Sequence, residues 1–290
     1  MIVVTAPTGQ IGSRVLADLL QHDEPVRVIA RDPGKLPAST RDRVDIVQGS
    51  HGNSDVVERA FEGADALFWL APGVPDAPSI YQAYVGFAIP AADAIVHHAV
   101  PRVVAVSALG RGVPGYAGHV SATLAMDDLI RSTGAHTREL ANPSFMDNRL
   151  RDADSIRDGS YSGTLPADLK LPTIATKDIG DAAARLLLDH TWTDQQAVPL
   201  LGAEDLSEND VAAILTDVLG RTVRYQLGDR DEDKRTLMPY GMSEPVAQAL
   251  IDMDLAKAGG LDLSVQRTAN NTTPTTFRAW ATEILKPTVE

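Results

Sequence analysis

The first half of this 290-residue chain alternates short apolar runs with helix-like stretches, and this alternation restricts the fold more than any other feature of the sequence. Short runs of mostly apolar residues have the length and composition of strands buried on both faces. Five such runs lie at 2–5, 26–30, 44–47, 66–70 and 103–106, and a sixth strand is expected at 137–141, before Pro143. Stretches with helical spacing lie between them at 9–20, 53–61, 79–98 and 120–131. This order predicts an α/β fold with a doubly wound, parallel, Rossmann-like sheet.

The second half is less regular and predicts a smaller addition to that sheet. Residues 151–171 are polar and rich in Gly and Asp, which indicates loops or a small excursion from the sheet. Amphipathic helices are expected at 178–188 and 207–219, a short strand at 223–226 and a last helix at 276–285. We therefore expect a Rossmann domain over 1–150 and a small C-terminal α/β substrate lobe over 151–290, with residues 172–202 returning to the main domain.

Composition excludes several classes of function. Lys and Arg number 26 against 39 Asp and Glu, so the formal charge is −13, and a general nucleic-acid or anionic-membrane binder normally carries the opposite sign. The absence of cysteine excludes disulfides, cysteine-ligated metals and thiol catalysis. No signal peptide and no apolar run of about 18 residues is present, so we expect a cytoplasmic protein without membrane contact.

The turn after the first strand predicts a phosphate-binding site. Gly9 would let the backbone approach a pyrophosphate, Gly12 would let the helix pack closely on the sheet, and Thr8 adds a hydroxyl. The N–H groups that begin the helix, around Gln10 and Ile11, would face the phosphates. The position that normally begins such a turn with glycine is Ala6, which can hold the turn if its φ is negative, although its methyl group narrows the approach. A strand–turn–helix junction with two incidental glycines remains the alternative.

The residue after the second strand bears on the choice of cofactor. Arg31 stands there, and an arginine can pair with the 2′-phosphate of NADP(H), which makes NADP(H) the favoured cofactor. Asp32 is the next residue, and an acidic side chain would instead bind the ribose hydroxyls of NAD(H), so NAD(H) stays open. The alternative for Arg31 is an ordinary solvated charge.

Several ordered segments resemble the NmrA-like family of atypical short-chain dehydrogenases/reductases. The matching stretches are 4–12, 26–33, 61–72, 142–148, 178–183 and 206–221. The resemblance implies an NAD(P)-binding Rossmann domain with a small C-terminal lobe. Two departures concern Gly49-Ser50, where the family commonly has Gly-Asp, and Asn142, where an arginine often precedes Pro143.

The resemblance also implies where a cofactor would bind. The adenosine and phosphates would contact Thr8, Gly9, Gln10, Ile11 and Arg31. The segment past the fourth strand, which contains Leu70, Ala71 and Pro72, would line the cofactor. Ser107 would approach the nicotinamide, and the segment after the sixth strand, which contains Pro143, Ser144 and Phe145, would close over it.

The catalytic Tyr–Lys pair of typical short-chain dehydrogenases is absent. A lysine four residues after the tyrosine lowers the tyrosine pKa in those enzymes, whereas Tyr81, Tyr116 and Tyr161 are each followed at that spacing by Val or Leu. Ser107 and His119 are the remaining catalytic candidates, although a surface histidine at a helix start is the more common role for His119.

Three functions remain open. The first is an NAD(P)H-dependent reductase of a quinone-like or polycyclic aromatic acceptor, a reaction in which orientation matters more than a strong acid. The second is a non-catalytic NAD(P)-sensing regulator. The third is a tailoring enzyme associated with hydroxylation in aromatic natural-product biosynthesis. The expected partner is thus a small aromatic or quinone molecule, and whether the chain forms a homodimer stays open.

Other candidate sites have simpler explanations. Two adjacent residues on a helix diverge by about 100°, so we expect that His97 and His98 do not share a metal, and no carboxylate–His cluster has metal spacing. No metal site is therefore predicted. The aromatic residues that could line an apolar pocket, but more commonly belong to a core, are Trp69, Phe87, Phe145 and Trp280.

Overall fold

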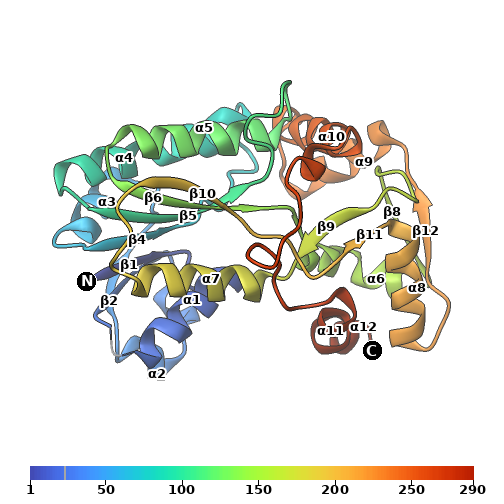
Figure 1. The fold of residues 1–290 in the computed structure, drawn as a ribbon, viewed down its shortest axis with the longest axis horizontal. Helices are drawn as coiled ribbons and strands as arrows, with labels where there is room; N and C mark the ends of the chain where they lie inside the picture. Colours follow the sequence, from blue (N-terminus) through green and yellow to red (C-terminus); the bar gives the residue numbers. More distant parts are fainter. Residues whose placement is uncertain (23) are drawn as a thin grey trace.

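A seven-stranded parallel sheet forms the centre of the computed structural model, which describes residues 1–22 and 24–290 (Figure 1). Its strand order is β3-β2-β1-β4-β5-β6-β10, and every neighbouring pair is parallel. The strands are β1 (Ile2–Thr5), β2 (Val26–Ala30), β3 (Asp45–Gln48), β4 (Ala66–Trp69), β5 (Arg102–Ala108), β6 (His136–Asn142) and β10 (Gln195–Pro199). The order 3-2-1-4-5-6 is that of the doubly wound dinucleotide-binding fold, so the predicted fold class is confirmed.

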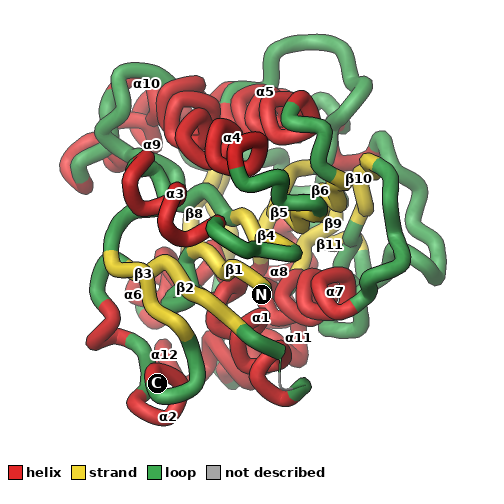
Figure 2. Tube along the Cα trace, turned by 90° about the vertical axis from the view of Figure 1, so that its left-hand side faces the viewer, coloured by secondary structure: helices red, strands yellow, loops and turns green. Residues whose placement is uncertain are grey.

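Helices cover both faces of this sheet (Figure 2). One face packs against α1 (Gln10–Gln21) and α7 (Thr176–Leu188), which also contact each other. The other face packs against α3 (Ser54–Phe61), α4 (Phe87–His97) and α5 (His119–Ser132). Two separate apolar clusters result, one on each face, which explains why the strand residues of both parities are apolar.

Local sequence signals position several helix ends. The Asn53 side chain accepts a hydrogen bond from the Val56 N–H and so caps α3. Ser207 and Asp210 form a reciprocal capping box at the start of α8 (Glu208–Leu219). Gly220 ends that helix in the left-handed region, at φ 66°. These sequence-visible caps explain why the predicted boundaries of both helices agree with the structure.

The C-terminal part adds two small sheets and several helices beside the carboxyl ends of the main strands (Figure 1). One sheet is β11-β9-β7 and the other is β12-β8. These strands are β7 (Ser144–Phe145), β8 (Ser160–Gly163), β9 (Leu171–Ile174), β11 (Asp205–Leu206) and β12 (Arg224–Leu227). The remaining helices are α2 (Ala38–Arg41), α6 (Ala153–Arg157), α9 (Arg230–Leu237), α10 (Glu244–Ala258), α11 (Phe277–Trp280) and α12 (Lys286–Val289). The C-terminal part has an apolar cluster of its own, which includes Phe277 and Trp280.

Two differences from the sequence prediction concern the central sheet and a helix that covers it. Strand β10 was not predicted, because its sequence begins Gln195-Gln196 and it pairs only with β6 at the sheet edge, where polar residues meet solvent. The helix predicted at 79–98 contains a π-helical turn, Gln82–Gly86, before α4. Pro90 lies one turn into α4 and cannot donate a hydrogen bond to the carbonyl of Gly86, which favours an irregular turn there. None of the helices described is long and apolar enough to span a bilayer.

Candidate functional site

One cavity of about 1140 Å³ runs along the carboxyl ends of the central strands. It begins at the turn between β1 and α1, passes the ends of β2, β4, β5 and β6, and reaches α10 of the C-terminal part. Strand order reverses between β1 and β4, and ligands of doubly wound folds bind at this reversal. The predicted cofactor residues that line the cavity are Thr8, Gly9, Gln10, Ile11, Arg31, Leu70, Ala71, Pro72, Ser107, Pro143, Ser144 and Phe145.

The turn at the start of α1 presents free backbone donors. Helical hydrogen bonding begins with the N–H of Ser13, which donates to the carbonyl of Gly9. The N–H groups of Gln10, Ile11 and Gly12 therefore precede the hydrogen-bonded ladder. Together with the dipole of this 12-residue helix, they form an arrangement suited to a phosphate.

Gly12 does not line the cavity and serves the fold instead. A Cβ on this residue would lie 2.1 Å from the carbonyl oxygen of Ala6, so α1 could not pack as it does. A Cβ on Gly9 would meet that same oxygen at an ordinary 3.5 Å. Of the two glycines, only Gly12 is therefore required by internal packing.

Ala6 holds the turn without the negative φ that would have left it unstrained. Its φ is 48°, in the left-handed region, instead of negative. The carbonyl of Ala6 accepts a hydrogen bond from the Gly9 N–H at 3.1 Å, which closes the turn that follows. A methyl-bearing residue in this region is strained, and such strain is concentrated at functional sites.

The adenosine end of the cavity contains two cationic side chains and a carboxylate that is already hydrogen-bonded to the backbone. Arg31 and Lys35 line it and are accessible. Asp32 also lines it, but its carboxylate accepts a hydrogen bond at 3.0 Å from the N–H of Gly34 and caps a short helical turn. Arg31 is thus better placed than Asp32 to meet a ligand, which favours a 2′-phosphate over bare ribose hydroxyls.

His51 borders the same end and was not singled out in the sequence. Its ring lies at the edges of Trp69 and Phe87, and its Nε2 is 3.0 Å from the carbonyl oxygen of Leu70. Burial lowers the His51 pKa to about 4, so the ring is neutral at pH 7. Of the four aromatic candidates for a pocket, Phe87 and Phe145 line the cavity, whereas Trp69 and Trp280 are core residues.

His119 is not the surface histidine expected as its more common role. It is the first residue of α5, lines the cavity, and lies edge-on to Tyr84, whose hydroxyl oxygen is hydrogen-bonded to Nε2. Burial lowers the His119 pKa to about 4, with Lys257 and Arg151 acting in the same direction, and burial raises the Tyr84 pKa to about 12. Both groups are neutral at pH 7, so neither is a strong acid.

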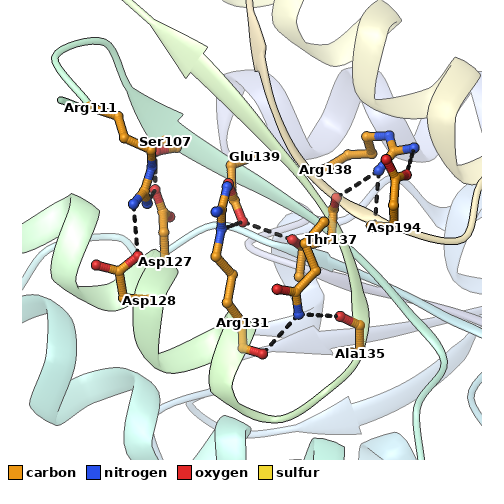
Figure 3. A network of polar contacts seen from close by, with 11 residues as sticks. Ser107, Arg111, Asp127, Asp128, Arg131, Ala135, Thr137, Arg138, Glu139 and Asp194 are labelled. Carbon is orange, nitrogen blue, oxygen red and sulfur yellow. Dashed lines mark hydrogen bonds and ion pairs between the residues drawn. The ribbon is translucent and has the colours of Figure 1, made fainter.

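Ser107 lines the cavity but its hydroxyl proton is committed. The hydroxyl donates to Asp127 on α5, and Figure 3 shows this contact at one end of a wider polar network between α5 and strands β5 and β6. Arg111 approaches the same carboxylate at 3.6 Å. Burial raises the Asp127 pKa to about 7, although the Ser107 hydrogen bond opposes this shift. Ser107 is therefore held as an acceptor rather than as a donor toward a ligand.

A buried lysine from α10 completes the far end of the cavity. The Nζ of Lys257 lies 2.7 Å from a carboxylate oxygen of Asp262 and 2.9 Å from the hydroxyl of Ser144. The side chains of Lys257 and Asp262 are only 5% and 2% exposed. Helix α10 reaches the cavity because Gly118, at the start of α5, leaves no side chain between the two helices: a Cβ there would be 1.9 Å from the carbonyl oxygen of Ala249.

The structure brings together a carboxylate–His cluster that the sequence spacing did not indicate. His97 ends α4, His98 follows it in a non-helical conformation, and both rings turn toward Glu58 on α3. One Glu58 oxygen lies 2.7 Å from His97 Nδ1 and 2.9 Å from His98 Nε2. The 100° divergence of a regular helix does not apply here, because His98 has left the helix and the third member comes from a different helix.

The family profile described as NmrA-like matches residues 1–281 of the 290. The chain belongs to the NmrA-like family. A relative from Streptomyces griseus, a (4-alkanoyl-5-oxo-2,5-dihydrofuran-3-yl)methyl phosphate reductase, is 28% identical over 98% of this chain and 97% of its own. The solved NADPH-dependent quinone oxidoreductase of Escherichia coli, complexed with NADPH, has a TM-score of 0.78 at 22% identity and covers 96% of this chain and 97% of that chain. A Citrobacter triphenylmethane reductase complexed with NADP(H) has a TM-score of 0.77 at 19% identity, over 96% and 98%.

This NmrA-like chain also places residues in the cavity that sequence analysis did not select. They come from segments far apart in the chain: His51, Tyr84, Thr123, Asn148, Arg151, Leu250, Met253 and Lys257. Of these residues, His51, Tyr84 and Thr123 could have been suspected from the sequence, because they lie near predicted strand ends or helix starts. The members from α10 could not, because nothing in the sequence places that helix over the carboxyl ends of the strands.

Proposed function

We propose that this NmrA-like chain is an NADPH-dependent oxidoreductase that reduces a conjugated acceptor of the quinone type. The observation that carries the proposal is the single cavity, which joins the phosphate-type turn at Gly9 to a partly apolar chamber under α10. Ligand pockets typically measure about 300–1,000 Å³, so a cavity of about 1140 Å³ has room for a dinucleotide and part of a second molecule. The reductase activities named for the relatives support the same assignment.

The residues present fit NADPH. The donors that begin α1 suit the pyrophosphate, Arg31 suits the 2′-phosphate, and the Pro143–Ser144–Phe145 segment suits the nicotinamide. NADPH, when bound, supplies a hydride. What the chain contributes is orientation and exclusion of water around the acceptor, because His119 and Tyr84 remain neutral.

The acceptor would lie toward the C-terminal lobe. Leu250 and Met253 of α10 give that end apolar and polarizable contacts, and Tyr84, beside His119, gives it an aromatic one. A flat conjugated molecule suits these surfaces. We therefore assign acceptor binding mainly to the lobe over residues 151–290, with Tyr84 contributed by the main domain, and cofactor binding to residues 1–150.

Two measurements test the proposal. Titration with NADPH and NADH, followed by the fluorescence of the reduced nicotinamide, should show saturable binding with NADPH the tighter ligand. Mixing the protein with NADPH and a panel of quinones should then consume NADPH, followed by its absorbance. Tight binding without consumption of NADPH by any acceptor would favour the sensing function instead, and no saturable binding would refute both.

A further inference from the structure

We propose that Ser144 and Lys257 form the proton-donating pair of this site, and that the acceptor they serve is one whose carbonyl oxygen becomes negatively charged as the hydride arrives. This inference rests on the proposed reductase function and specifies its substrate class. It assigns a role to a buried ion pair that cofactor binding does not require. It also supplies a proton donor, which the Tyr–Lys pair provides in typical short-chain dehydrogenases and which is absent from this chain.

The direction of the hydrogen bonds around Lys257 shows which proton is available to a ligand. An ammonium group has three donors and no acceptor, so Lys257 donates both to Asp262 and to the Ser144 hydroxyl oxygen. The Ser144 oxygen thereby uses an acceptor position, and its own proton has no described acceptor within the protein. Since Ser144 lines the cavity, that proton is free to point at a ligand.

The other hydroxyl groups at this end are already committed. Ser107 donates to Asp127, the Tyr84 hydroxyl is hydrogen-bonded to His119, and Thr123 donates to the carbonyl of His119. Among these lining hydroxyls of the described chain, Ser144 is the one that accepts a hydrogen bond from a cation while its own proton has no described acceptor. The Lys257 charge also reaches the acceptor end, because it acts on the pKa of His119.

The buried ion pair makes the Ser144 donor strong. Lys257 is almost fully buried, so its charge is poorly screened by water and polarises the Ser144 hydroxyl. Asp262 holds the ammonium in place from the opposite side. A donor fixed in advance, in a site with little water, stabilises developing negative charge more than a mobile one does.

With a quinone as the acceptor, the hydride supplied by bound NADPH brings two electrons and one proton. The acceptor then becomes a hydroquinone monoanion with its charge on oxygen. Ser144 gives its hydroxyl proton to that oxygen and takes a proton from the Lys257 ammonium. The Lys257 amine then regains a proton from water, so the hydroquinone forms with no other oxidant or reductant.

The same arrangement disfavours an acceptor that is itself a cation. A triphenylmethane dye cation takes up a hydride at carbon to give a neutral product and needs neither a proton nor an oxyanion site. Lys257, together with Arg151, would moreover repel it, since Arg151 also lines the cavity and forms no ion pair with another described residue. Substitution of Ser144 or Lys257 should therefore slow the reduction of a quinone more than the reduction of a cationic dye.

The first experiment needs no turnover. 4-Nitrophenol is a phenol whose ionised form absorbs visibly, and its pKa can be titrated while bound to the NADP⁺-loaded or cofactor-free protein. We expect the wild-type protein to lower the pKa of bound 4-nitrophenol, and the K257M/D262N variant to abolish that shift. The double substitution avoids leaving Asp262 buried without a partner, which would destabilise the fold. An equal shift in both proteins would overturn the proposal, whether or not the protein is a reductase.

The second experiment compares acceptors. Ser144→Ala should lower kcat for a quinone about 10²-fold, the loss expected on removal of one such donor, whereas Ser144→Thr retains the hydroxyl and should recover most of the rate. Reduction of malachite green, where the wild type catalyses it, should not show a comparable loss. Lys286→Met, which removes an exposed lysine paired with Glu290, is the matched control and should change neither rate. Equal losses on both acceptors would mean that Ser144 and Lys257 only position the nicotinamide segment.

A second inference rests on a different observation: we infer that Glu58, His97 and His98 form a surface site for Zn²⁺. One ligand atom from each residue lies within 4.8 Å of the other two, and the shared Glu58 oxygen already draws both rings together. Two imidazoles and one carboxylate are ligands that Zn²⁺ prefers, at about 2.0–2.2 Å, with water in the fourth position. An ion between the three atoms would replace the two Glu58 hydrogen bonds, with a small closing movement of the rings.

Calorimetric titration of the untagged protein with Zn²⁺ tests this inference. We expect one strong site at pH 7.5, with one ion bound per chain. Glu58→Gln, His97→Ala and His98→Ala should each weaken binding at least tenfold. His22→Ala, at an exposed histidine remote from the cluster in sequence, is the control and should leave binding unchanged. Binding that survives all three cluster substitutions would overturn the assignment.

Discussion

The carbonyl oxygen of Ala6 lies 2.1 Å from the position that a Cβ atom on Gly12 would occupy. The turn that brings these two residues together is closed by the Gly9 N–H, which bonds to that same oxygen. Ala6 also has a positive φ, which an L-residue adopts at some cost. The close approach of the first strand to the first helix thus depends on one missing side chain and one strained residue.

Substitution of Ala6 by glycine should stabilise the protein. Glycine adopts a φ of 48° without the methyl clash, a gain of about 1 kcal/mol that is partly offset by the greater freedom of glycine in the unfolded chain. Urea unfolding should show a higher midpoint at an unchanged m-value. Removal of the methyl group should also tighten NADPH binding. A lower unfolding midpoint for Ala6→Gly would contradict the strain at this turn.

The two glycines of the turn should separate stability from binding. Gly12→Ala forces a Cβ against backbone atoms and should destabilise the fold by about 1–3 kcal/mol. Gly9→Ala meets only an ordinary contact at 3.5 Å, so it should leave the unfolding midpoint nearly unchanged while weakening NADPH binding. Equilibrium unfolding and fluorescence titration of the two variants provide the comparison. If Gly9→Ala proved the more destabilising of the two, these roles would be reversed.

Substitution of Arg31 by alanine should discriminate between the cofactors. NADPH should lose about 2 kcal/mol of binding free energy because the 2′-phosphate loses a charge-assisted partner, whereas NADH should bind almost as before. Lys35→Ala, at the neighbouring cation of the same end, is the matched control and should have the smaller effect. Fluorescence titrations of both cofactors measure this, and equal losses for NADPH and NADH would mean that Arg31 does not contact the 2′-phosphate.

The sheet could be predicted from the sequence because its strands are buried on both faces. Val3 and Val4, for example, point into opposite apolar clusters, so neither parity of β1 is polar. The same reasoning could not find β10, because an edge strand with one neighbour tolerates Gln195 and Gln196. Apolar periodicity thus predicts the centre of a sheet better than its margin.

The cofactor turn was visible because its residues are adjacent in the chain, whereas the acceptor end was not. Ser144 and Lys257 are 113 positions apart, and their contact depends on how α10 packs over Gly118. His119 was visible as a residue but not as a neutral one, because its pKa depends on tertiary packing that no local pattern encodes.

The rate of NADPH oxidation should show no histidine inflection near pH 6.5. Burial holds the His119 pKa at about 4, so the ring stays neutral throughout the range from pH 5.5 to 8. kcat/KM against a quinone whose own charge is constant over this range measures this directly. An inflection between pH 6 and 7 that disappears in His119→Gln would show that His119 titrates during turnover and is an acid after all.

Asp127 should make the stability of the protein fall as the pH rises. Burial raises its folded-state pKa to about 7, above the value of about 3.9 expected for an unfolded aspartate, so between these two pH values unfolding releases a proton. The charges that face it, Arg111, Arg131 and Glu139, are retained in Asp127→Asn, which removes only this titration. The wild-type free energy of unfolding should therefore fall, relative to that of Asp127→Asn, by about 1.4 kcal/mol per pH unit near pH 5.5 and level off above pH 7. Urea unfolding of both proteins from pH 4.5 to 8 measures the two slopes, and parallel curves would show that Asp127 is already ionised in the folded protein at the lower end of this range.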